Sequence, residues 1–207
     1  MIEAYVEIGV ALATDSGVAA WSYAPELWGR CGQGPDEAAA LAALTDRPTV
    51  VVERVVGDER AFKADLRPAT PAQRDATLQI LARARAETIG LIAAAPDHVL
   101  DRDDPERVLP AFASWRTLRQ MAWHLADTES RYYLPSVGLP SRPRVPDLLD
   151  ELAASAHHVR STLVAAPPDL TRTASGETWT TTKLLRRLAW HEPAELVTMH
   201  ALATSCP

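Results

Sequence analysis

The fold is decided by the stretch from Trp179 to Glu195, WTTTKLLRRLAWHEPAE, near the carboxyl end of the chain. Its leucines recur at spacings of three and four residues, which predicts a helix from about Thr180 to Thr204. His191 and Glu195 lie on the same face as these leucines, four residues apart. Because titratable side chains are costly to bury without partners, this core-facing helix predicts a polar site inside the protein.

Three further helical segments lie upstream of this helix. Thr70 and Pro71 supply an N-cap and a first helical residue, and apolar residues then recur at helical spacing as far as Ala94. Helical patterns follow at residues 114–133 and, after a break rich in Pro and Gly, at about residues 146–166. Four helices of about 20 residues each predict an all-α four-helix bundle, which would occupy residues 67–207.

The first third of the chain has a different character. Alternating or β-branched segments predict strands at residues 2–8, 18–21 and 49–56, the last of them a central strand. A turn is expected at residues 15–17, and residues 25–34 are too rich in Pro and Gly for regular structure. An alanine-rich run at residues 37–44 predicts a short helix. Residues 1–66 are therefore expected to form a small α+β domain that precedes the bundle.

Composition argues against several classes of partner. The net charge of −6 disfavours a nucleic-acid or anionic-membrane surface, because phosphate binding depends on clustered Lys and Arg. No apolar run approaches the roughly 20 residues needed to cross a bilayer, and no signal peptide is visible. Cys31 and Cys206 do not make a disulfide framework, so the expected compartment is the cytoplasm.

A second histidine completes a candidate metal site. His124 lies at the edge of the apolar stripe of the second helix, where it can face His191 and Glu195 of the fourth helix. Two imidazoles and one carboxylate suit zinc in a catalytic site with an open coordination position. The same set also suits iron, nickel or manganese. On spacing alone, a salt bridge or a solvated face is the commoner role for His and Glu four residues apart.

Two segments resemble the DinB-like superfamily, which includes thiol-dependent transferases and the mycothiol-dependent maleylpyruvate isomerase. HLADTE at residues 124–129, with two tyrosines shortly after it, resembles the second-helix motif of that group. The stretch from Trp179 to Glu192 resembles its tryptophan-led fourth helix. The resemblance covers roughly residues 70–204. It implies a four-helix bundle in which one second-helix histidine and two fourth-helix residues bind a metal.

The chain departs from this pattern at one ligand position. Glu195 stands where the group usually has a second histidine, and Pro193 lies between the two fourth-helix candidates. Carboxylate is a competent ligand, so the resemblance still implies a divalent metal, zinc first, bound by His124, His191 and Glu195. Such a metal lowers the pKa of a bound low-molecular-weight thiol, which implies a transferase or isomerase acting on a small electrophilic molecule.

Two acidic residues lie close to His124 in the sequence. Asp127 and Glu129 are candidates for orienting a ligand histidine without binding the metal themselves. The preferred interpretation of each is nevertheless an exposed helical face. No general base is evident, so the sequence identifies no catalytic residue.

The first domain resembles the HicB-like fold. YVEI at residues 5–8, APELWGRCGQG at residues 24–34 and PDEA at residues 35–38 follow the order of motifs in that fold. The resemblance implies a β-β-β-α-β module of the kind seen in antitoxins and in stand-alone proteins. No DNA-binding segment is visible, and no active site is assigned to this domain.

This second resemblance keeps other functions open. The alternative to a metal-dependent enzyme is a non-catalytic binding or regulatory protein, in which the HicB-like module holds a partner or a second copy of the chain as a homodimer. A third hypothesis is an antitoxin-like protein without its own DNA reader. The two leading hypotheses differ in whether the protein contains metal.

Overall fold

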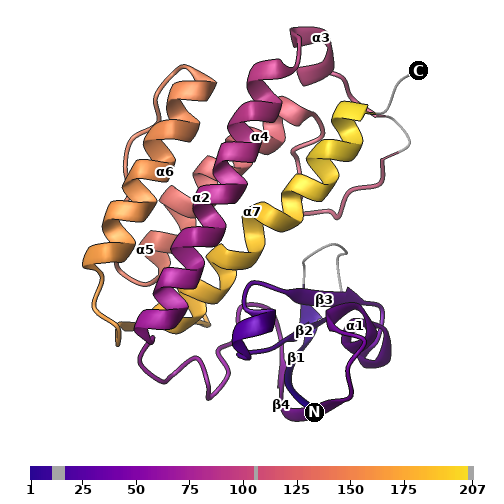
Figure 1. Cartoon of the computed structure of the whole chain (residues 1–207), viewed down its shortest axis with the longest axis vertical. Helices are drawn as coiled ribbons and strands as arrows, with labels where there is room; N and C mark the ends of the chain where they lie inside the picture. The colour runs from indigo at the N-terminus through magenta and orange to yellow at the C-terminus, as the bar shows by residue number, and fades with distance from the viewer. Residues whose placement is uncertain (11–16, 105–106, 205–207) are drawn as a thin grey trace.

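A computed structural model describes residues 1–10, 17–104 and 107–204. Of the turn expected at residues 15–17, only Gly17 is described; Asp15 and Ser16, like Cys206, lie outside the described residues. The chain forms an N-terminal sheet, then a set of helices that run side by side, with a small hairpin before the last helix (Figure 1). No described helix has the length and apolar character that a membrane span requires.

The N-terminal sheet has the strand order β3-β2-β1-β4. Its elements are β1 (Ile2–Val10), β2 (Gly17–Trp21), β3 (Cys31–Gly34), α1 (Glu37–Leu44) and β4 (Thr49–Val56). A short helical turn, η1 (Pro25–Leu27), separates β2 from β3. Strand β1 pairs antiparallel with β2 and parallel with β4, and α1 packs on one face of the sheet. The strands predicted at residues 2–8, 18–21 and 49–56 and the short helix at residues 37–44 are therefore confirmed.

Two expectations for this sheet are wrong. Strand β4 lies at an edge and not in the centre, because β-branched composition favours a strand without fixing its place in the sheet. The glycine-rich residues 31–34 form a strand, although they were expected to be irregular. The glycines of this segment serve close packing and not a turn. A Cβ at Gly32 would stand 2.0 Å from the carbonyl oxygen of Ala40 in α1. The glycines of β3 allow α1 to lie directly against the strand.

The helices begin and end close to the predicted positions. The long ones are α2 (Pro71–Ala94), α4 (Leu118–Asp127), α6 (Leu148–Ala165) and α7 (Thr181–Thr204). Thr70 and Thr117 each form a capping box, which fixes the start of α2 and of α4. Shorter pieces are α3 (Asp97–Leu100), the π-helical segment η2 (Thr128–Tyr133) and α5 (Leu134–Ser136). Helix α4 thus continues into η2 without leaving the helical path.

The expectation of an all-α four-helix bundle is wrong. A two-stranded antiparallel hairpin, β5 (Thr171–Ala174) and β6 (Glu177–Thr180), lies between α6 and α7. Its turn residues Ser175 and Gly176 both have positive φ, 54° and 83°, as a tight two-residue hairpin requires. This hairpin makes the region after residue 66 mixed and not purely helical.

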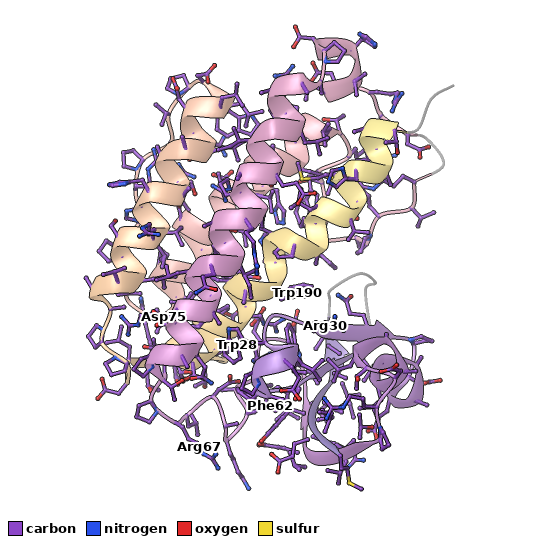
Figure 2. The ribbon with its side chains drawn as sticks, in the orientation of Figure 1. Trp28, Arg30, Phe62, Arg67, Asp75 and Trp190 are labelled. Carbon is purple, nitrogen blue, oxygen red and sulfur yellow. The ribbon has the colours of Figure 1, made fainter. Side chains whose placement is uncertain are left out.

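The sheet packs against the first half of α7. Trp28 donates its indole N–H to Thr77 Oγ1 of α2 at 2.9 Å, and Trp190 of α7 packs edge-on against Trp21 of β2. Figure 2 shows Trp28, Phe62 and Trp190 where the sheet meets the helices. Apolar clusters therefore run across the boundary expected near residue 66.

Buried ion pairs reinforce this contact. Three cations of α7 each meet an acid of the N-terminal region: Arg186 with Asp65 at 2.8 Å, Arg187 with Glu7 at 3.2 Å, and Lys183 with Glu59 at 3.0 Å. Lys183, Arg186 and Arg187 of α7 therefore face the N-terminal region and not solvent.

Candidate metal centre

The three predicted ligands converge on one point between α4 and α7. His124 Nε2 lies 3.2 Å from His191 Nε2 and 4.0 Å from Glu195 Oε1. One ligand atom from each residue lies within 4.8 Å of the other two. Helical periodicity brings His191 and Glu195 to the same face of α7, and α4 packs against that face. The cluster can hold a metal ion.

Burial sets the protonation state of these side chains. It lowers the pKa of the His124 imidazole to about 4 and that of His191 well below its ordinary value. Burial also raises the pKa of the Glu195 carboxyl to about 6, although the nearby Arg107 guanidinium opposes this shift. Near neutral pH the cluster therefore consists of two neutral imidazoles and a carboxylate, which are the forms that bind metals.

The spacing of the two histidines fits zinc. Tetrahedral zinc with bonds of about 2.0–2.1 Å holds two nitrogen ligands about 3.3 Å apart. The observed separation of 3.2 Å between the Nε2 atoms matches this value. Glu195 stands slightly farther away and needs only a small side-chain shift to join them. Without a cation, one Nε2 must carry a proton that the other accepts, because two facing lone pairs repel.

Two neighbours hold His124 in place. The indole of Trp115 stacks on its imidazole with ring centroids 3.6 Å apart and planes 9° from parallel. The hydroxyl of Thr128 lies 3.2 Å from His124 Nδ1, the ring nitrogen that faces away from the cluster. The sequence analysis singled out neither residue. The spacing of four between His124 and Thr128 was a usable signal, whereas Trp115 precedes the helix and gave none.

On the side that faces away from the cluster, His191 is held by packing alone. Its Nδ1 atom is buried and has no hydrogen-bond partner among the described residues. The rings of Tyr133 and Trp190 lie 5.5 Å and 6.1 Å from its ring, edge-on in both cases. Metal-binding histidines ordinarily donate this second N–H to an acceptor, so the chain departs here from the common pattern.

Asp127 and Glu129 contact arginines and not the ligand histidines. Asp127 pairs with Arg131 at 2.7 Å and also with Arg144. Glu129 is only 1% exposed and pairs with Arg85 at 2.8 Å. The preferred interpretation of Glu129, an exposed helical face, is therefore wrong. The wider π-helical turn of η2 directs this side chain into the interior. Thr128, between the two acids, has the contact with His124 for which they were the low-ranked candidates.

Pro193 does not break the helix between the two α7 ligands. A proline lacks the N–H that residue 193 would donate to the carbonyl of Ala189, yet α7 is continuous from Thr181 to Thr204. Gly29 of the N-terminal module lies against that carbonyl, since a Cβ there would be 2.9 Å from the oxygen. His191 and Glu195 therefore remain one turn apart.

A cavity of about 250 Å³ adjoins the cluster beside Glu195. Aromatic side chains form much of its wall: Phe112, Trp115 and Trp190. Arg107, whose guanidinium also hydrogen-bonds the carbonyl oxygens of Trp115 and Arg116, supplies a positive charge. The cavity is suited to a small molecule with an unsaturated or apolar body.

Comparisons of the chain with protein-family models, with curated proteins and with solved structures found no match. The resemblances to the DinB-like and HicB-like groups therefore remain predictions from the sequence. The convergence of His124, His191 and Glu195 is the observation from which a function is argued.

Proposed function

We propose that the protein binds one divalent metal ion, preferably zinc, through His124, His191 and Glu195, and that it acts as a thiol-dependent transferase or isomerase. One observation carries the proposal: two buried, neutral histidines face each other at 3.2 Å beside a carboxylate. The resemblance of HLADTE and of the tryptophan-led helix to the DinB-like superfamily supports the same ligands and the thiol chemistry.

A zinc ion with three protein ligands offers an open position at which a thiol loses its proton near neutral pH. The protein's own residues would position the second reactant. Trp115 and Trp190 provide flat apolar surfaces beside Glu195, where the body of a small electrophile can pack. Arg107 can pair with an anionic group of that molecule.

The test is a thiol-dependent reaction of a small electrophile. Protein purified without a tag and loaded with zinc is mixed with a low-molecular-weight thiol and an electrophile such as 1-chloro-2,4-dinitrobenzene. We expect consumption that needs both protein and thiol, and that is lost in His191→Ala but kept in His98→Ala, which alters an exposed histidine. Zinc-loaded protein that leaves every thiol and electrophile pair at the uncatalysed rate would contradict the enzymatic part of the proposal.

A further inference from the structure

A second cavity, of about 310 Å³, lies between α2 and α6, which run side by side (Figure 1). It shares no lining residue with the cavity beside Glu195. Apolar side chains form most of its wall, among them Leu78, Leu81 and Ile89 of α2 and Val159 of α6. A dry cavity of about 150 Å³ already holds benzene, so this one has room for a chain of several carbon atoms.

The polar groups at the inner end of the cavity are engaged with one another. Arg85 donates from Nε to Glu192 Oε1 at 2.8 Å and from Nη2 to Glu129 Oε2 at 2.8 Å. Its third nitrogen, Nη1, donates to the carbonyl oxygen of Leu152 at 2.7 Å. The other oxygens of the two carboxylates are buried beyond the reach of a ligand. The inner end of the cavity therefore favours the apolar end of a ligand.

The mouth of the cavity, where its lining residues are exposed, carries positive charge. These exposed residues are Ala82 and Ala86 of α2 and His157 and Arg160 of α6. His157 and Arg160 lie three positions apart, so both project from the same side of α6. Among the described residues that line the cavity, the only acids are the two buried ones bonded to Arg85. The mouth is therefore complementary to an anionic group.

We propose that this cavity binds a medium-chain fatty acid, with its carbon chain against the apolar side chains of α2 and α6 and its carboxylate at Arg160. Burial of the chain supplies most of the affinity, because it removes apolar surface from water. The carboxylate stays at the mouth, where Arg160 attracts it while both groups keep their contact with water. An alcohol of the same length lacks the charge, and an alkylammonium has the wrong sign.

Titration calorimetry with butanoate, hexanoate and octanoate tests the contribution of the carbon chain. We expect one octanoate to bind per molecule, with an affinity that rises about fourfold for each methylene that the cavity buries. Octanol and octylamine test the head group. Octanoate should bind about threefold tighter than octanol, since an exposed ion pair contributes little, and tighter still than octylammonium. Because the cavity is separate from the proposed metal centre, these affinities should be the same with and without zinc.

Two pairs of variants locate the site. Ala156 of α6 lines the cavity, so Ala156→Leu should occupy part of it and weaken octanoate binding about tenfold or more. Ala153→Leu makes the same change one turn away, at an exposed position that does not line the cavity, and should bind as the wild type does. Arg160→Gln should abolish the threefold preference for octanoate over octanol, whereas Arg83→Gln, which removes an exposed α2 charge away from the cavity, should keep it.

The proposal is overturned if the affinity does not rise with chain length, or if octylamine binds as tightly as octanoate. It is also overturned if Ala156→Leu and Ala153→Leu bind octanoate alike. Circular dichroism checks that each variant is folded. Should Ala156→Leu fail to fold, the chain-length series on the wild type and the comparison of Arg160→Gln with Arg83→Gln decide the matter.

Discussion

Burial acts on the three candidate metal ligands in opposite directions. It keeps His124 and His191 neutral far into acid, whereas it makes Glu195 harder to ionise. Among these three groups, Glu195 therefore loses its metal-binding form first as the pH falls. The carboxylate that replaces the expected histidine is thus the residue that sets the pH range of the site.

Metal affinity should accordingly depend on pH through one group. Glu195 has a raised pKa of about 6, so its carboxylate is present above that pH and is protonated below it. The apparent affinity for zinc should be level above about pH 6 and should fall about tenfold per pH unit between about 6 and 4, since one proton competes with the metal. Competition with a chelating dye across this range measures it. An affinity that stays level down to about pH 4 would contradict the assignment of Glu195 as a ligand.

The hydroxyl of Thr128 should matter through its contact with His124. Thr128→Val keeps the shape of the side chain but removes the partner of His124 Nδ1. We expect zinc affinity to fall about tenfold or more, as for other contacts that orient a metal-binding histidine. Thr204→Val, at the end of α7, removes a hydroxyl that bonds only the carbonyls of its own helix and should leave the affinity unchanged. Equal affinities of the two variants would show that Trp115 alone orients the ring.

The candidate site could be predicted from the sequence in part. The helical spacing of His191 and Glu195, together with the DinB-like resemblance that also singles out His124, was enough to choose three side chains that the structure brings together. Trp115 could not be predicted, because its stacking on His124 depends on the path of the chain before α4. The burial of Glu129 depends on η2, a change of helical hydrogen bonding that periodicity at 3.6 residues does not reveal.

Among the elements, β3 and α1 depend most directly on glycine. Gly32→Ala would place a Cβ 2.0 Å from the carbonyl oxygen of Ala40 and 2.4 Å from the amide nitrogen of Leu44. These are backbone atoms that cannot move without separating the helix from the strand. We expect a loss of about 3 kcal/mol or more in the free energy of unfolding, measured by chemical denaturation.

A matched glycine in a helix should respond in the opposite way. Gly90 lies in α2, and a Cβ there meets nothing within 4 Å. Gly90→Ala should therefore stabilise the protein by up to about 1 kcal/mol, because alanine is the better helix former. A larger loss in Gly90→Ala than in Gly32→Ala would contradict the packing of α1 on β3.

The elements that the sequence predicted well are those with strong local signals. Helix α2 begins at Thr70-Pro71, as the capping residues indicate, and α7 follows its leucine spacing. The β5-β6 hairpin was missed although its signal is local: threonine occupies every second position before the Ser175-Gly176 turn, at residues 171 and 173, and after it, at residues 178 and 180. The edge position of β4 has no local signal, because it depends on which strands pair.

At the scale of the whole molecule, α7 joins the two parts of the chain. Its first turns carry Lys183, Arg186 and Arg187 against the N-terminal region, and His191 and Glu195, farther along the helix, are two of the three candidate metal ligands. Trp28 and Trp190 extend the apolar contact on either side. Because this interface is buried, we expect the sheet and the helices to unfold together.

Breaking a buried ion pair of this interface tests that expectation. Arg186→Met leaves Asp65 buried without its guanidinium partner, which should cost about 3–5 kcal/mol of unfolding free energy. Arg54→Met removes an exposed pair with Glu37 and should leave the unfolding free energy nearly unchanged. Denaturation followed by far-ultraviolet circular dichroism and by tryptophan fluorescence should give one coincident transition in the wild type. Two separated transitions, or no difference between the variants, would show that the parts are independent.

The most direct test of the proposed metal centre is the metal content of the protein. Chain purified without a tag, equilibrated with zinc and freed of excess ions should retain close to one zinc per molecule by elemental analysis. His124→Ala and Glu195→Ala should lose most of it, while His98→Ala retains it. Wild-type protein that retains no zinc, or ligand variants that retain as much as the wild type, would contradict the proposal that these three side chains bind one metal ion.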